Sequence, residues 1–107
     1  MKQDFIGKYK IKEMEMWDKD YIDMEVPGYI ELHKNGTADF QFGLVSGGGQ
    51  YSYSKDGKYI DFRWAGNDEC DEASGEFELE INGNKMTGTV FLDYGDESAL
   101  TAVKEKS

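Results

Sequence analysis

The sequence predicts an all-β domain, an eight-stranded antiparallel up-and-down meander that closes into a small barrel. Three observations predict it: apolar and polar residues alternate along nearly the whole chain, glycine-containing turns separate the alternating runs, and no stretch has a helical period. A two-sheet β-sandwich would satisfy the same pattern. We favour the barrel because closure removes unpaired strand edges and lets neighbours in sequence be neighbours in space.

The alternation assigns one inward, apolar phase to each expected strand. This phase comprises Tyr9 and Ile11; Ile30 and Leu32; Ala38, Phe40, Phe42 and Leu44; Tyr51 and Tyr53; Ile60, Phe62 and Trp64; Phe77, Leu79 and Ile81; Met86, Val90 and Leu92; and Leu100 and Ala102. The outward phase includes Glu31, His33, Asp39, Gln41, Asp61, Arg63, Glu76, Glu78 and Glu80. In the first strand the pattern slips after Lys12, so that Met14 and Met16 take the apolar phase, which predicts a β-bulge or a sharp bend there. The large inward aromatics predict a filled interior, with a ligand cavity as the alternative.

Three short turns, which contain Gly36, Gly57 and Gly83, fix how the strands pair. A three-residue loop at the first turn and two-residue loops at the other two keep inward residues opposite one another. The expected pairs are Leu32 with Ala38, Ile30 with Phe40, Tyr53 with Ile60, Tyr51 with Phe62, and Ile81 with Met86.

Length and composition limit the function classes. The 107 residues form a single domain spanning 1–107, and the formal charge of −10 argues against binding to nucleic acid or to anionic membranes. Cys70 is the only cysteine, so no intramolecular disulfide forms and a reducing, cytoplasmic setting is expected. The first residues, from Met1 to Phe5, predict no signal peptide, although a signal removed from a longer precursor stays open. No apolar run reaches the roughly 20 residues of a membrane span.

The connections divide the charge between the two ends of the predicted barrel. The long ones, 17–27, 65–75 and 93–98, hold eleven of the 22 acidic residues and only one basic residue, Lys19. In an up-and-down order, alternate connections share an end, so these three lie together and the short turns lie opposite. The carboxylates expected at this end are Asp18, Asp20, Asp23, Glu25, Asp68, Glu69, Asp71, Glu72, Asp93, Asp96 and Glu97. Lys34, Lys55, Lys58 and Lys85 flank the turns of the other end, with Lys2, Lys8, Lys104 and Lys106 near the chain ends.

A ligand site is predicted at the acidic, aromatic-edged open end. Its residues are Trp17, Asp18, Asp20, Tyr21, Trp64, Asp68, Asp71, Tyr94, Asp96 and Glu97. Aromatic faces beside carboxylates suit organic cations, so the ligand is expected to be a cationic or amphipathic small molecule. The segment 17–27 is interpreted either as a lid over this end or as aromatic packing that excludes water.

Two other partners would suit the same residues. One is a basic protein, to which the acidic loops would present an imitation of nucleic acid. The other is a divalent cation, chiefly Ca²⁺, held by clustered loop carboxylates. The candidate ligands are Asp18, Asp20, Asp68, Asp71, Asp96 and Glu97. Their spacing does not fit an EF-hand loop, and no resident metal or cofactor is predicted.

The sequence favours a non-enzymatic protein. His33 is the only imidazole, and its phase places it outward near a short turn, as an ordinary surface residue. Cys70 stands among four carboxylates, which disfavour a thiolate. The run Gly47-Gly48-Gly49 lacks the following helix and Lys of a phosphate-binding loop.

The first strand resembles a known group. Phe5-Ile-Gly7-Lys-Tyr9-Lys-Ile11 is similar to the Phe-x-Gly-x-Trp-x-Ile opening of the lipocalins and fatty-acid-binding proteins, the calycins, with Tyr9 in place of Trp. The resemblance implies that this motif plugs the closed end, that the first loop crosses the open end, and that a basic residue of the last strand, Lys104, covers the aromatic ring.

More of the chain resembles a family of small bacterial proteins to which no function is assigned. The residues that carry this resemblance are Trp17-Asp-x-Asp20, Gly28-Tyr-Ile30, Phe42-Gly43, Trp64-x-Gly66-x-Asp68-Glu69 and Gly95-Asp96-x-Ser98. The resemblance supports the fold and implies no chemistry.

Overall fold

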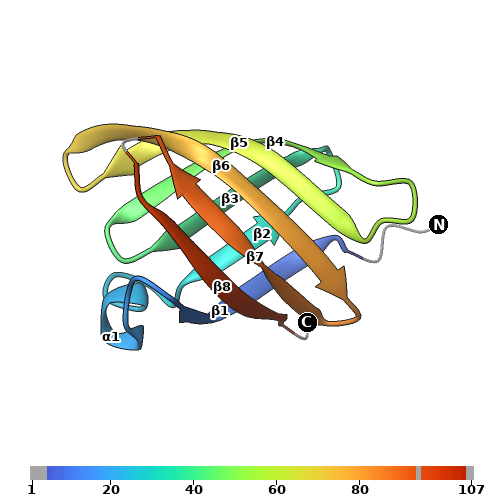
Figure 1. Cartoon of the computed structure of the whole chain (residues 1–107), viewed down its shortest axis with the longest axis horizontal. Helices are drawn as coiled ribbons and strands as arrows, with labels where there is room; N and C mark the ends of the chain where they lie inside the picture. The colour runs from blue at the N-terminus through green and yellow to red at the C-terminus, as the bar shows by residue number, and fades with distance from the viewer. Residues whose placement is uncertain (1–4, 94, 106–107) are drawn as a thin grey trace.

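Eight strands and one helical turn make up the computed structural model, which describes residues 5–93 and 95–105. The elements are β1 (Gly7–Met14), α1 (Lys19–Ile22), β2 (Tyr29–Leu32), β3 (Thr37–Phe42), β4 (Val45–Tyr53), β5 (Tyr59–Asp68), β6 (Asp71–Asn82), β7 (Lys85–Leu92) and β8 (Glu97–Lys104). Each strand pairs antiparallel with its neighbours in sequence, and β1 also pairs with β8, so the sheet closes (Figure 1). The predicted barrel is therefore confirmed, and the sandwich is excluded.

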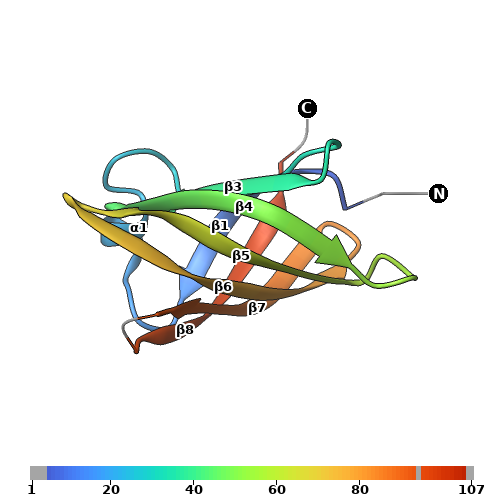
Figure 2. The same cartoon turned by 90° about the horizontal axis from the view of Figure 1, so that it is seen from above.

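The barrel is elongated, with principal extents of 39 × 23 × 21 Å (Figure 2). The connections after β1, β3, β5 and β7 lie at one end, and the other three lie at the opposite end, beside the N-terminal part of β1 (Figure 1). The prediction that alternate connections lie at the same end of the barrel is thus confirmed. Among the described residues, no helix is long and apolar enough to cross a bilayer.

The predicted registers of the three glycine turns are confirmed. Leu32 pairs with Ala38, Tyr53 with Ile60 and Ile81 with Met86, as the matching of inward phases requires. Gly36, Gly57 and Gly83 all have positive φ, which glycine adopts without steric cost. The β4–β5 loop is nevertheless wider than the two residues expected. The Ser54 N–H donates to the Tyr59 carbonyl at 2.9 Å and the Gly57 N–H donates to the Ser54 carbonyl at 2.8 Å, so the loop spans 55–58.

The bulge predicted in β1 lies between Ile11, which pairs with Ala102, and Glu13, which pairs with Thr101. Met14 is buried beyond the bulge, as expected. Met16 is 51% exposed, so its assignment to the inward phase was wrong. It lies after the last residue of β1, where its backbone N–H donates to Ser98 Oγ at 3.0 Å and the chain leaves the barrel wall.

Three other expectations need correction. Leu44 belongs to the β3–β4 turn, and Val45 takes the buried position, because Gly43-Leu44 forms a two-residue connection. Tyr53 is 49% exposed, because β4 reaches past the end of the core there. The segment 65–75 is not a long loop: β5 and β6 continue through it to the pair Asp68–Asp71. Polar side chains are compatible with strands in this region because the hairpin extends beyond the packed interior.

The closed end agrees with the expectation from the calycin resemblance. Tyr9 is fully buried, and its hydroxyl donates to the carbonyl of Phe5 at 2.8 Å. Lys104 pairs with Tyr9 across β1 and β8, and its Nζ lies 6.0 Å from the centre of the Tyr9 ring. Phe5 is 2% exposed and meets Tyr51 edge to face. Phe5 and Tyr9 therefore plug this end of the barrel.

Aromatic rings fill the interior. Phe40 lies 4.9 Å from Trp64 and 4.8 Å from Phe77, both in edge-to-face contact, and Phe62 stacks on Phe77 at 4.9 Å. These separations are within the preferred range for aromatic pairs, and all four side chains are at most 3% exposed. The described residues thus form a packed core rather than a hollow lined by inward side chains.

Burial raises the pKa of the Tyr9 phenol to about 12. Because the folded-state value exceeds the unfolded value of about 10, the stability that Tyr9 contributes is complete below pH 10 and is lost as the pH rises towards 12. We expect Tyr9→Phe to cost about 1 kcal/mol at pH 7, through the lost hydrogen bond, and to reduce the loss of stability between pH 10 and 12. Urea unfolding at pH 7 and between pH 10 and 12 measures the free energy of unfolding of both proteins. The exposed Tyr59→Phe is the control, and an unchanged alkaline loss in Tyr9→Phe would contradict the prediction.

Candidate functional site

The candidate site is the acidic end, defined as the barrel end that carries α1, the β3–β4 turn, the tip of the β5–β6 hairpin and the β7–β8 turn. Figure 1 places these four connections at the same end, opposite the end at which β1 begins. The carboxylates expected there from sequence lie on three of them, α1 with its flanks, the hairpin tip and the β7–β8 turn. Tyr94, which was predicted as a site residue, lies outside the described residues.

The single turn of α1 begins and ends on acidic side chains. Asp18 is the N-cap and accepts a hydrogen bond from the Tyr21 N–H at 3.0 Å, a contact that satisfies one of the free donors of a helix start. Asp23 follows the turn and accepts from the Gly28 N–H at 2.8 Å, and it also pairs with Lys19. These contacts, with Lys19 the larger cause, lower the pKa of Asp23. Two acids of this segment therefore have structural roles.

The segment 17–27 caps the barrel. We expected a loop here, and the structure corrects this: Lys19–Ile22 forms a helical turn because Asp18 caps it and Ile22 is fully buried beneath it. The acidic groups of this segment still lie at the same end of the barrel as the other acidic connections, because the segment crosses that end (Figure 1). The Gly43 N–H donates to the Ile22 carbonyl at 2.9 Å, which ties the cap to the β3–β4 turn.

Two aromatic side chains of this cap rest on the core. Trp17 is half-buried and lies 5.0 Å from Phe42 and 6.2 Å from Tyr21, ring centre to ring centre. The Tyr21 hydroxyl accepts from the Leu44 N–H at 3.3 Å. The aromatic groups expected at the edge of an open end thus close that end, and only their outer parts face solvent.

The tip of the β5–β6 hairpin is a separate acidic element. Glu69 and Cys70 form its two-residue turn between Asp68 and Asp71. Glu69 has a φ of 63° and is the one non-glycine residue of positive φ in the described chain. Cys70, Asp71 and the adjacent Glu72 are exposed. Carboxylates on such a tip point into solvent, where screening keeps their repulsion small.

The β7–β8 turn carries the remaining predicted acids. Asp96 and Glu97 are exposed. Asp93 pairs with Arg63 of β5 and accepts from the Ser74 hydroxyl at 2.7 Å, so it links the turn to the neighbouring hairpin. Asp20 of α1 is likewise exposed, whereas Asp68 is only partly so. Of the acids predicted for the site, Asp18, Asp20, Asp71, Asp96 and Glu97 are exposed.

Trp64 differs from the other predicted site residues because it lies in the core, 1% exposed. Its indole N–H is buried without a hydrogen-bond partner among the described residues, a situation that costs about 1–3 kcal/mol. The sequence pattern had already assigned it to the inward phase. Its position at the end of an apolar run suggested a rim residue, but β5 continues for four residues beyond it.

The loop carboxylates do not converge on a common point. Among the described residues, the one group of three or more candidate metal ligands within 4.8 Å of one another is Glu31, His33 and Asp39, which lies on β2 and β3. The predicted Ca²⁺ ligands at the acidic end therefore gain no support from the geometry.

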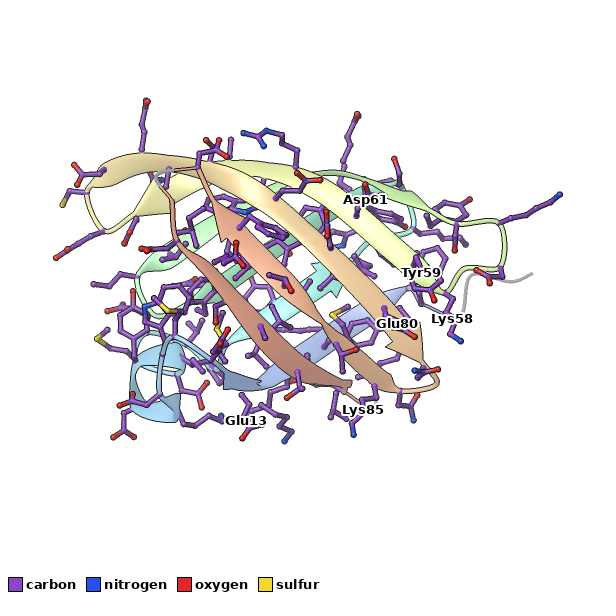
Figure 3. All side chains as sticks on the ribbon, viewed as in Figure 1. Glu13, Lys58, Tyr59, Asp61, Glu80 and Lys85 are labelled. Carbon is purple, nitrogen blue, oxygen red and sulfur yellow. The ribbon has the colours of Figure 1, made fainter. Side chains whose placement is uncertain are left out.

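Sequence reasoning overlooked a groove on the outer wall. It measures about 410 Å³ and is lined in part by Tyr59, Asp61, Glu78 and Glu80. Figure 3 shows Tyr59, Asp61 and Glu80 together on the outside of β5 and β6. Asp61 directly opposes Glu78 in the register, a like-charge pair that disfavours the folded sheet. The outward phase predicted from sequence contained Asp61, Glu78 and Glu80 but not Tyr59, and the meander order already placed their two strands side by side.

Comparisons with protein-family models, with curated proteins and with solved structures give no match for this chain. The fold and the surface of the described residues therefore carry the functional argument.

The fit between the cap and the barrel depends on Gly43. Its φ is +58°, and an added Cβ would lie 2.2 Å from a ring carbon of Tyr21. Gly83 has a similar φ of +63° with nothing within 4 Å of an added Cβ, so it is a matched control. We expect Gly83→Ala to cost about 1–2 kcal/mol from backbone strain and Gly43→Ala to cost about 1–3 kcal/mol more. Urea unfolding measures both, and equal losses would show that Tyr21 does not hold the cap.

Proposed function

We propose that this protein is a non-enzymatic binding module that uses its acidic end to bind a basic protein surface. The observation that carries the proposal is the display of exposed carboxylates on three neighbouring connections of a barrel whose interior is filled. A filled interior leaves the outer surface as the place of contact, and exposed acids steer a cationic partner towards it.

The spacing of the acidic elements favours a broad partner over a small ligand. In Figure 1 the β5–β6 tip and α1 lie on opposite sides of the same end, and Figure 2 shows the β7–β8 turn apart from the β5–β6 tip. A small molecule would meet one of these elements, whereas a protein surface would meet several. Charge complementarity of this kind supplies association rate and specificity, and it weakens as salt screens the charges.

The proposal also includes a cellular compartment and a relationship to other barrel proteins. A reducing, cytoplasmic compartment agrees with the single exposed cysteine, Cys70. A relationship to the lipocalin and fatty-acid-binding barrels, or to the small bacterial proteins that resemble this chain, is supported by the buried Tyr9 beneath Lys104. The proposal is non-enzymatic because the sole imidazole, His33, lies beside the 34–36 turn, at the other end of the barrel.

Neutralising the hairpin tip tests the proposal. We expect Glu69→Gln/Asp71→Asn/Glu72→Gln to bind a fluorescent Lys-rich peptide about tenfold more weakly in low salt, at roughly 0.5 kcal/mol for each lost charge. Fluorescence anisotropy at low and at physiological salt measures the affinity. Wild-type binding should also weaken steeply between the two conditions.

A control variant distinguishes a local site from overall charge. Asp61→Asn/Glu78→Gln/Glu80→Gln removes the same number of charges from the outer groove, and we expect it to change the affinity by less than twofold. Equal losses in both variants would mean that only net charge matters. A larger loss in the control would move the binding surface to the groove.

A second candidate function is favoured by the half-buried Trp17 stacked with Tyr21 beside Asp18 and Asp20. The exposed part of these rings, next to carboxylates, suits the head group of an amphipathic cation. This ligand would lie on the cap, against α1, and not inside the barrel.

Tryptophan fluorescence tests this second function. An alkyltrimethylammonium amphiphile, titrated below its critical micelle concentration, should quench Trp17 emission, and Trp17→Ala should abolish the response while the buried Trp64 still emits. Tyr59→Ala, which changes an exposed ring of the outer groove, should leave the response unchanged. Quenching that persists in Trp17→Ala would remove the cap as the binding place.

A further inference from the structure

We propose a Zn²⁺-binding site on the outer face of β2 and β3, formed by Glu31, His33 and Asp39. This proposal does not rest on the function proposed for the acidic end, because the cluster belongs to different strands and lies beside the 34–36 turn. The ligand is a divalent transition-metal ion of the kind that imidazole and carboxylate groups bind together.

The strand register brings the three residues together. Glu31 and His33 are two positions apart, so both side chains leave the same face of the sheet. Asp39 stands directly opposite Glu31 in the β2–β3 pair. His33 follows the last residue of β2, and its N–H donates to the Thr37 carbonyl at 2.8 Å, so the ladder continues past it and fixes its direction.

The distances already approach those of a metal site. His33 Nε2 lies 3.4 Å from Asp39 Oδ2, and His33 Nδ1 lies 4.0 Å from Glu31 Oε2. One ligand atom from each of the three residues falls within 4.8 Å of the others. Tetrahedral Zn²⁺ with bonds of about 2.0–2.2 Å sets its ligand atoms roughly 3.4 Å apart. Because Zn²⁺ takes only one of the two ring nitrogens, one carboxylate has to turn towards the nitrogen that the other already faces. Three bonds then form, and a fourth position is left for water.

A second observation points to a cation at this place. Asp39 Oδ1 is shielded from solvent and has no hydrogen-bond partner in the described part of the chain, although 47% of the Asp39 side chain as a whole is exposed. An unpaired buried carboxylate oxygen is unfavourable, and a cation held by this carboxylate would offset the cost. Gly48 stands opposite Asp39 on β4, so no side chain from that neighbouring position covers the carboxylate.

The charges around the cluster point the same way. Glu31 and Asp39 are like charges directly opposed across two strands, an arrangement that disfavours pairing. Lys8, opposite Glu31 on β1, has its Nζ 4.5 Å from the centre of the Tyr29 ring. A bound divalent cation would neutralise both carboxylates at once.

The ligand groups of the cluster favour Zn²⁺ over Ca²⁺. One imidazole with two carboxylates suits Zn²⁺, whereas Ca²⁺ prefers six to eight oxygens. The acidic end contains oxygen donors and the exposed thiol of Cys70, which also binds Zn²⁺. A test must therefore separate the cluster from both.

The experiment uses the untagged full chain with Cys70→Ser, in millimolar Ca²⁺ to occupy weak oxygen sites. Isothermal titration with Zn²⁺ should give one ion per chain. Because His33 is the only histidine, its imidazole resonances report the cluster directly, and one ring ¹⁵N signal should shift strongly on binding. Absence of binding, or binding that leaves the His33 resonances unchanged, would overturn the proposal.

Variants give an independent readout. His33→Gln and Asp39→Asn should each weaken Zn²⁺ binding at least about tenfold, whereas the exposed Glu78→Gln, on the far strand β6, should change it by less than twofold. Circular dichroism verifies that each variant is folded. Undiminished affinity in His33→Gln would place the ion elsewhere, and a failure of Zn²⁺ binding would leave the peptide-binding test of the acidic end unaffected.

Discussion

The pairing of β1 with β8 is the constraint on which the arrangement of the other groups depends. This pairing needs the bulge between Ile11 and Glu13. Without the shift in register, the side chain of Met14, which pairs with Leu100, would point outward into solvent. Closure also brings Lys104 over Tyr9 and buries Ser98 under the end of β1. Once the barrel is closed in sequence order, alternate connections lie at the same end, so the acidic and the lysine-rich turns must lie at opposite ends.

How the ends are closed decides where recognition takes place. Phe5 and Tyr9 plug one end, and Ile22 beneath Trp17 and Tyr21 plugs the other. Apolar packing, not charge, holds the cap in place, since its acids either cap backbone groups or face water. Exposed carboxylates at separate tips repel one another weakly in salt, so the fold tolerates them without an internal counter-charge. They remain available for a partner that brings the opposite charge.

Much of this could be predicted from sequence because period-2 alternation and turn length together determine register. Pairing Leu32 with Ala38 already implies that Glu31 opposes Asp39, so the zinc-ligand cluster was within reach of the same reasoning. The predictions failed where burial depends on how far a strand extends: Trp64 and the segment 65–75 were misjudged because polar residues on an overhanging hairpin look like a loop. The helical turn of α1 was missed because four residues give no period. The Asp18 cap, the buried Ile22 and the hydrogen bond from the Gly43 N–H to the Ile22 carbonyl stabilise it.

The glycine run of β4, Gly47 to Gly49, allows β4 to lie close to β5. An added Cβ at Gly47 would lie 3.0 Å from the Trp64 ring and 2.7 Å from the Ala65 carbonyl oxygen, and at Gly49 it would lie 2.0 Å from the Arg63 carbonyl oxygen. These glycines therefore allow β4 and β5 to approach closely around a large indole, and a phosphate-binding role is not needed to explain them. The same close approach helps large rings to pack against one another in the eight-stranded interior. The proposed functions accordingly use outer residues, whose positions are set by the sheet register and the turns.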